Sequence, residues 1–342
     1  MRIQLLAATA LVATLPLAPS AANAAGSLNM ICAADVKWCE LMENMFEKSH
    51  DIDVNMVRMS SGEAYARIRA ESRNPKTDLW WAGTGDPHLQ AAQDGLTLEY
   101  KSPKLSELQP WAQHQAEVSG YRTVGVYSGA LGWGYNTDIL EKKGAEPPKC
   151  WKDLTSDAYR GEIQVANPNS SGTAYTALAT LVQIMGEDEA FAYLRKLNDN
   201  VTQYTKSGSA PVKAAARGET GIGIVFMHDA VAMTVQGFPV KTVAPCEGTG
   251  YEVGSMSIVK GARNLENAKT FYDWALSADV QSKAVEADSF QIPSNKRATV
   301  PPEAPNLDEI KLIDYDFAKY GDSDTRKALL ERWDREIGAI AK

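Results

Sequence analysis

The sequence predicts an α/β protein of two domains, each a mostly parallel sheet flanked by helices, with a ligand cleft at the hinge between them. Without the leader segment described below, about 318 residues remain, more than the ~100–200 residues usual for one domain. Short apolar runs typical of strands alternate with longer helical patterns, as in α/β layers. Two extended, glycine-interrupted runs, 127–136 and 250–259, are interpreted as crossings between the domains.

The alternation can be followed along the chain. The expected strand–helix pairs are Leu28–Cys32 with Trp38–Lys48, Ile52–Val57 with a helix ending near Glu71, Leu79–Trp80 with His88–Ala92, Ile163–Ala166 with Ala174–Met185, and Ile222–Phe226 with Asp229–Gln236. The predicted boundaries are a leader at 1–24, a discontinuous first domain at 25–131 plus 255–305, and a second domain at 132–254 plus 306–342. The alternative is that the glycines mark only bulges within a single sheet.

The first 24 residues have the pattern of a secretory signal peptide. Arg2 supplies a positive charge, Leu5–Leu17 an apolar segment, and Ala22-Asn23-Ala24 a cleavage site. The apolar segment is short for a membrane span, and no cysteine follows the cleavage site to carry a lipid. We therefore expect an exported protein in the periplasm of a Gram-negative bacterium.

Composition narrows the class of protein. The chain has 35 basic and 43 acidic residues and a net charge of −8, which argues against nucleic acid as a partner. Its four cysteines suit an oxidising compartment. A local disulfide between Cys32 and Cys39 would leave Cys150 to pair with Cys246, but four cysteines allow three connectivities and the sequence does not choose. The cysteine spacing is not that of a metal site.

Four turns rich in Ser, Thr and Gly lead into helical patterns. They are Met59–Tyr65, Trp81–Pro87, Asn167–Thr176 and Thr205–Pro211. Free N–H groups and the positive end of a helix bind phosphate or another oxyanion, although a single such turn is more often only an N-cap. Four of them together predict convergence on one anionic group, to which Arg58 or Lys206 would add a charge.

The order of these motifs resembles the periplasmic substrate-binding proteins of ABC importers, over nearly the whole chain after the leader. The resemblance is to the branch of ferric-binding proteins and hexose-phosphate or organophosphonate binders. Its marks are Asp78–Gly85, Gly132–Asn136, Asn167–Thr176, Glu247–Glu252 and Gln291–Asn295. It implies the type II binding-protein fold, one small anionic organic solute per chain, a monomer, and delivery to an inner-membrane permease and its ATPase.

Ferric-binding members of this branch hold iron with adjacent tyrosines, and the matching place here carries His228-Asp229. Fe(III) prefers anionic oxygen ligands, so this exchange, with the Ser-Gly-Thr turn retained, favours a phosphorylated metabolite. The predicted ligand-binding residues are Ser60, Ser61, Gly83, Thr84, Ser171, Gly172, Thr173, Ser207, His228, Asp229, Glu252 and, ranked after Glu252, Glu247. No cofactor and no metal are expected.

Other histidines and aromatic residues have simpler interpretations. His50, His88 and His114 are expected to be ordinary surface or capping residues. The aromatic residues beside the strands more often belong to the core than to a cleft; they are Trp80, Trp81, Trp133 and Tyr135.

Two other functions compete with capture of an organophosphate. A ferric or other metal-binding importer component is the first alternative. A phosphoester hydrolase using Ser171, His228 and Asp229 is a remote second, because adjacent His and Asp side chains do not form the line of a catalytic triad. The hydrolase and nucleotide-binding motifs G-x-S-x-G, H-E-x-x-H and G-x-x-x-x-G-K are absent, so no enzyme activity is expected.

Overall fold

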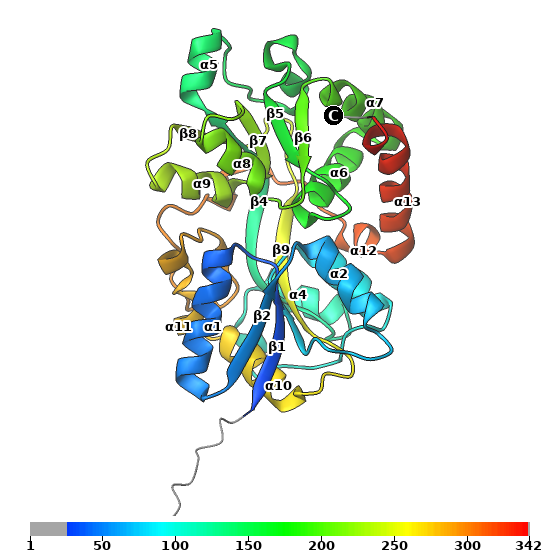
Figure 1. Cartoon of the computed structure of the whole chain (residues 1–342), viewed down its shortest axis with the longest axis vertical. Coiled ribbons are helices and arrows are strands. Elements are labelled where there is room, and N and C mark those ends of the chain that lie inside the picture. Colours follow the sequence, from blue (N-terminus) through cyan, green and yellow to red (C-terminus); the bar gives the residue numbers. More distant parts are fainter. Residues whose placement is uncertain (1–25, 341–342) are drawn as a thin grey trace, which may run out of the picture.

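The computed structural model describes residues 26–340, so the predicted signal peptide lies outside the described residues. Two α/β lobes are stacked along the long axis of the molecule, with two long strands, β4 (Val124–Asn136) and β9 (Tyr251–Ile258), running between them (Figure 1). In the described part of the chain, every helix is too short or too polar to cross a membrane.

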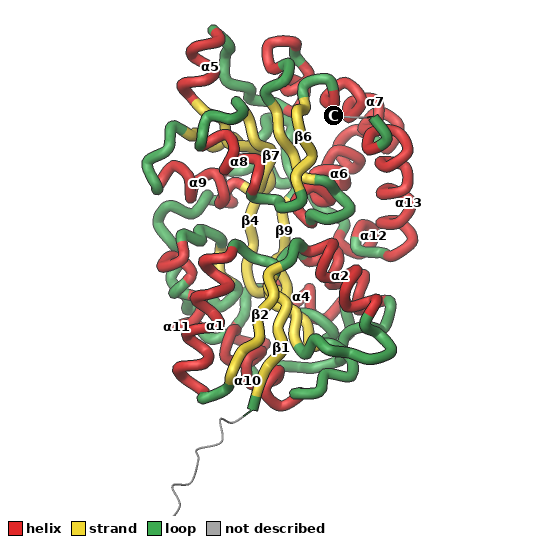
Figure 2. Tube along the Cα trace, viewed as in Figure 1, coloured by secondary structure: helices red, strands yellow, loops and turns green. Residues whose placement is uncertain are grey.

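The first lobe contains the N-terminal elements and a later return of the chain. Its elements are β1 (Ser27–Cys32), α1 (Val36–His50), β2 (Asp53–Arg58), α2 (Ser61–Ala70), β3 (Leu79–Trp81), α3 (Gly85–Gln93), α4 (Pro110–Val118), α10 (Leu265–Ala275), α11 (Ala278–Gln281) and β10 (Ile292–Pro293). Its main apolar core contains Trp38, Phe46, Trp81 and Phe271, and a smaller cluster around Ile68 and Trp80 holds α2 and α3. Helices lie on both sides of the strands (Figure 2).

The second lobe has its own core, around Trp133, Trp151, Tyr175 and Phe191. Its elements are α5 (Thr137–Lys143), β5 (Ile163–Ala166), α6 (Gly172–Met185), α7 (Glu187–Asn198), β6 (Val201–Thr205), α8 (Ala210–Ala216), β7 (Ile222–Phe226), α9 (Met227–Val235), β8 (Val240–Val243), α12 (Phe317–Tyr320) and α13 (Ser323–Trp333). The C-terminal helix α13 packs onto this core through Leu329 and Trp333.

The strands form a mixed sheet in the order β2-β1-β3-β9-β4-β7-β5-β6. Pairs within each lobe, such as β1–β2 and β5–β6, are parallel, whereas the pairs that β4 and β9 make are antiparallel. Strand β4 pairs with β9 up to Ala130 and with β7 from Leu131 onward. The α/β class is thus confirmed, and we propose the domain boundary at this switch of partner.

The two crossings have the glycines that their close packing requires. A Cβ on Gly129 would lie 2.5 Å from Nδ1 of His228, and one on Gly254 would lie 2.1 Å from the ring of Tyr127. These glycines therefore make room for side chains that line the space between the lobes.

Both disulfides are closed as the local pairing suggested. Cys32 bonds to Cys39 at the turn from β1 into α1, and Cys150 bonds to Cys246 across the second lobe. The prediction that the cysteines form disulfides is confirmed, the structure supplies the connectivity that the sequence left open, and the described residues contain no free cysteine.

Candidate functional site: a cleft between the lobes

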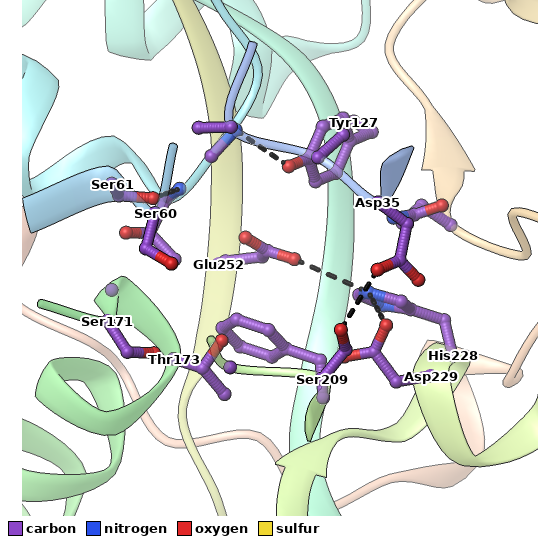
Figure 3. A pocket seen from close by; sticks show the side chains of 18 of the residues that line it. Asp35, Ser60, Ser61, Tyr127, Ser171, Thr173, Ser209, His228, Asp229 and Glu252 are labelled. Atoms are coloured by element: carbon purple, nitrogen blue, oxygen red, sulfur yellow. Dashed lines mark hydrogen bonds and ion pairs between the residues drawn. The ribbon is translucent and has the colours of Figure 1, made fainter. Parts of the chain in front are cut away.

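A cavity of about 450 Å³, including its open mouth, lies between the lobes. It is lined by both lobes and by the crossing strands, and it has two chemically different ends (Figure 3). Its polar lining side chains are Asp35, Arg58, Ser60, Ser61, Thr84, Tyr127, Ser171, Thr173, Ser209, His228, Asp229, Glu252 and Gln291.

Hydroxyl groups at helix N-termini form the first end. Ser60 precedes α2 and Thr84 precedes α3 in one lobe, and Ser171 precedes α6 in the other. An anion placed among them would meet three positive helix ends, and this requires no net positive charge on the protein. Ser209, which precedes α8, lines the other end of the cavity, where its hydroxyl donates to Asp35.

Local bonds hold these turns in place. Ser171 Oγ accepts from the N–H of Ala174, which is the N-cap bond of α6, and Ser61 Oγ accepts from the N–H of Thr84 at 3.2 Å. Thr84 Oγ1 itself is buried and has no hydrogen-bond partner among residues 26–340. A buried hydroxyl without a partner is costly, so Thr84 is suited to donate to a bound group.

The approach of the lobes here depends on a glycine. A Cβ on Gly172 of α6 would lie 1.8 Å from Oγ1 of Thr84 in the other lobe. Direct bonds also cross the cleft: the N–H of Gly62 donates to the carbonyl of Ser170 at 2.9 Å, and Ser60 Oγ donates to the carbonyl of Lys206 at 3.2 Å. The structure therefore has the lobes closed on each other.

Acidic groups around one histidine form the second end. His228 and Asp229 lie in the first turn of α9, and Glu252 lies on β9. His228 Nε2 is 3.7 Å from Asp229 Oδ1 and 3.8 Å from Glu252 Oε1. His228 Nδ1 is buried and has no hydrogen-bond partner in the described chain. These groups supply both acceptors and donors for hydroxyl or amine groups on a ligand.

Burial sets the protonation of this end. It raises the pKa of Asp229 to about 8, helped by the negative charge of Asp35, and lowers the pKa of His228 to about 3. Burial also raises the pKa of Glu252 well above its ordinary value, with a contribution from Asp229. At neutral pH the imidazole is neutral, and both acids are shifted toward their proton-carrying form.

The raised pKa of Asp229 predicts a pH dependence of stability. Its carboxyl has a pKa of about 8 when folded and ~3.9 when unfolded, so the folded state binds more protons between these values. This contribution is fully present below pH ~4 and is lost as the pH rises toward 8. Asp229→Asn should remove that loss. Urea unfolding from pH 4 to 8 should therefore show the variant gaining stability relative to wild type as pH rises; a constant difference would contradict the assignment.

Most predicted site residues meet in this cleft, and two do not. Glu247 lies elsewhere: its carboxylate accepts from the N–H groups of Trp151 and Lys152 at 2.7 and 3.1 Å. The structure therefore corrects the expectation that Glu247 contacts the ligand. The Glu247 carboxylate caps the turn after the Cys150–Cys246 disulfide, and of the two glutamates only Glu252 lines the cavity. Ser207 lies just outside, accepting from Arg58, while the next two residues reach the cavity.

The prediction for His88 was wrong. Its side chain is fully buried, stacks on Trp80 at 3.6 Å between ring centroids, and shares a hydrogen bond with Ser257 Oγ at 2.8 Å. His114 is exposed. The four aromatic residues beside the strands are buried outside the cavity lining, as expected for core residues.

Sequence reasoning missed several lining residues. Asp35 precedes α1 in the position of an N-cap, yet its side chain makes no capping bond and instead crosses the cleft to Ser209 and Lys213 at 2.9 and 2.8 Å. Burial raises the pKa of Asp35, but the charge and hydrogen bond of Lys213 more than offset it and hold this pKa below its ordinary value. The available signal was an acidic residue just before a helix, at a turn between two cysteines. Such a residue indicates a helix N-cap rather than a contact with the ligand.

Two lobes joined by crossing strands, with a polar cleft between them, define a solute-binding protein. The family model for bacterial extracellular solute-binding proteins matches residues 42–311. The chain belongs to this family, whose members capture solutes outside the inner membrane for ABC importers, and it is a periplasmic solute-binding protein of that kind. Its relatives are transport proteins rather than enzymes.

Solved structures and curated relatives agree with this assignment. The chain is 47% identical to the periplasmic binding protein AfuA from Actinobacillus pleuropneumoniae, solved with exogenous fructose-6-phosphate bound, with a TM-score of 0.90 over 92% of this chain and 100% of that one. It is 40% identical to the periplasmic binding protein P5PA, with a TM-score of 0.88 over 91% and 99%. A Salmonella typhimurium periplasmic protein, provisionally assigned to binding 2-aminoethylphosphonate, is 24% identical over 76% of this chain and 75% of its own length.

Proposed function

We propose that this protein captures a phosphorylated small molecule, a sugar phosphate or an organophosphonate, and delivers it to a membrane permease driven by an ATPase. The observation that carries the proposal is the convergence of hydroxyl-bearing helix N-termini from both lobes on one cavity. The phosphoryl group would bind there and draw the lobes together. The AfuA structure, with its bound fructose-6-phosphate, supports the same ligand class.

The end of the cavity that contains His228, Asp229 and Glu252 would bind the organic part of the ligand. Neutral His228 and the acids Asp229 and Glu252, whose pKa values are raised by burial, can both donate to and accept from hydroxyl groups. A site built to pair with such groups discriminates strongly against ligands that lack them, because its buried polar groups are then left unpaired.

The alternative functions have weaker support. Across residues 26–340, three potential metal-ligand atoms lie close together only at Cys150, Cys246 and Glu247, whose cysteines are joined in a disulfide. For hydrolysis, a general base would have to bond Ser171 Oγ, but the contacts of His228 Nε2 are to Asp229 and Glu252. We therefore propose binding without catalysis.

Ser171→Ala tests the anion pocket. A hydrogen bond to a charged group contributes roughly 1.5–3 kcal/mol, so the affinity for fructose 6-phosphate should fall more than about tenfold by calorimetry. Ser156→Ala is the matched control, because it also removes an N-cap hydroxyl but one outside the cavity lining. An unchanged dissociation constant for Ser171→Ala would remove this hydroxyl from the site.

A further inference from the structure

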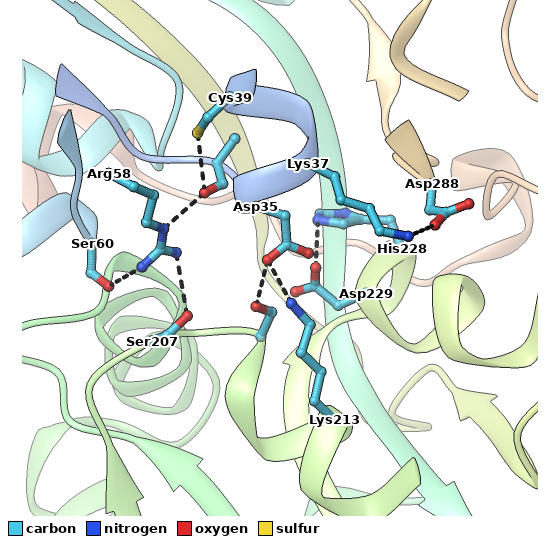
Figure 4. Close-up of polar contacts among 12 residues, drawn as sticks. Asp35, Lys37, Cys39, Arg58, Ser60, Ser207, Lys213, His228, Asp229 and Asp288 are labelled. Carbon is cyan, nitrogen blue, oxygen red and sulfur yellow. Dashed lines mark hydrogen bonds and ion pairs between the residues drawn. The ribbon is translucent and has the colours of Figure 1, made fainter. Parts of the chain in front are cut away.

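Asp35 and Lys213 form a bridge between the lobes at the edge of the cavity. Asp35 lies at the start of α1 in the first lobe, and Lys213 lies in α8 of the second (Figure 4). Lys213 Nζ and Ser209 Oγ both donate to Oδ1 of Asp35, at 2.8 and 2.9 Å. The side chains of Asp35 and Lys213 are 35% and 36% exposed, so the bridge lies at the surface of the closed cleft.

A second groove begins on the other side of this bridge. It has a volume of about 720 Å³ including open solvent, and Asp35 lines both the groove and the ligand cavity. Val36, Lys37, Met233 and Phe238 are among its walls, so it offers apolar surface beside charged residues of both signs. Elements of both lobes contribute to it, and Lys37 is tied to Asp288 by an ion pair at 2.6 Å.

The bridge adjoins the end of the cavity that would hold the organic part of the ligand. Asp35 is close enough to Asp229 for its charge to raise that residue's pKa. The hydroxyl-rich end, with Ser61 and Ser171, lies on the other side of the cavity (Figure 3). An organic group longer than the cavity would therefore meet Asp35 and Lys213 before it reached solvent.

We propose that the Asp35–Lys213 bridge is the size-determining wall of the site, which admits a phosphorylated monosaccharide-sized solute and excludes a phosphorylated disaccharide. This rests on the proposed function. The bridge can form only when the lobes close fully, so a solute that fits gains the closing contacts and a larger one does not. A ligand shifts the equilibrium between open and closed forms only by its difference in affinity for them. A solute small enough to let the bridge form should therefore bind more tightly than a larger one.

Removing the wall should join the cavity to the groove. Lys213→Ala deletes the ammonium group and most of its stem, and Asp35→Asn removes the charge while keeping the shape. The probes are fructose 6-phosphate and trehalose 6-phosphate, a phosphorylated disaccharide, each titrated by calorimetry into the full chain without its leader. Lys37→Ala is the matched control, because it breaks an ion pair of the same groove that does not close the cavity.

Wild type and Lys37→Ala should bind fructose 6-phosphate more tightly than trehalose 6-phosphate. In Lys213→Ala the ratio of the two dissociation constants should fall at least about tenfold, which is within the range of discrimination that the shape of a pocket supplies. Asp35→Asn should shift it in the same direction. An unchanged preference in Lys213→Ala, with fructose 6-phosphate still bound, would overturn the wall alone, as would wild type binding both compounds equally. Wild type that binds neither compound would overturn the wall, and it would overturn the proposed function as well if 2-aminoethylphosphonate, titrated in the same way, also fails to bind.

Discussion

Gly172→Ala is expected to weaken binding of fructose 6-phosphate by about ten- to a hundredfold while leaving the protein folded. The new methyl group would lie 1.8 Å from Thr84 Oγ1 and 2.8 Å from its Cβ, across the closed cleft. Rotating Thr84 does not clear its Cβ, so the lobes must move apart. Overpacking of this kind costs roughly 1–3 kcal/mol, and here that cost falls on the closed form.

The fold itself should tolerate this change. Gly172 opens α6 and has ordinary helical geometry, where alanine is favoured over glycine, so the unfolding midpoint should be unchanged or slightly raised. Gly221→Ala is the control, because a methyl there would approach only side-chain atoms, with Glu162 Oε2 nearest at 3.1 Å, and Gly221 lies outside the cavity lining. Small-angle scattering should show wild type, but not Gly172→Ala, becoming more compact with ligand. Full closure and wild-type affinity in Gly172→Ala would show that Thr84 and Gly172 do not meet in the bound state.

Asp229→Asn and His228→Ala are expected to separate recognition of the organic part from recognition of the anion. Each should reduce affinity for fructose 6-phosphate by ~1–3 kcal/mol, because buried polar groups lose their partners. Affinity for inorganic phosphate, where it is measurable, should change far less, since the hydroxyl groups at the helix ends are untouched. Asp53→Asn, at an exposed acid of the first lobe, is the control.

The same variants distinguish the ferric alternative. Titrating ferric citrate into wild type should produce no visible charge-transfer band, since the position of the tyrosine pair is held by His228 and Asp229. A tight coloured complex that both variants abolish would replace the organophosphate assignment. Equal losses for fructose 6-phosphate and inorganic phosphate would instead place His228 and Asp229 at the anion.

Much of the site could be predicted because its signals are local. A Ser or Thr before a helix, following a strand, is determined by neighbouring residues, and all four turns predicted in this way contribute residues to the cavity lining. The strand from Ile222 and the His228-Asp229 pair that follows it were also visible, although α9 begins at Met227, two residues before the expected start. In α/β folds the carboxyl ends of strands are where ligands bind, which is why the approximate place was right.

The roles of acidic and histidine side chains could not be predicted in the same way. Glu247 and Glu252 are five residues apart, yet one caps a turn in the second lobe and the other enters the cavity from a crossing strand. His88 looked like a surface residue because nothing nearby marks it as buried; its partners Trp80 and Ser257 lie on β3 and β9, which pair in the sheet.

The sequence by itself determined the α/β class, the turns that present hydroxyl groups at helix ends, and the glycine-rich strands that cross between lobes. These depend on periodicity, capping and backbone freedom, which act over a few residues. Only the tertiary structure decided that Asp35 meets Lys213, that Gly172 meets Thr84, and which glutamate faces the cleft. Those contacts join residues from opposite lobes, and they exist because closure brings surfaces together that no local pattern relates.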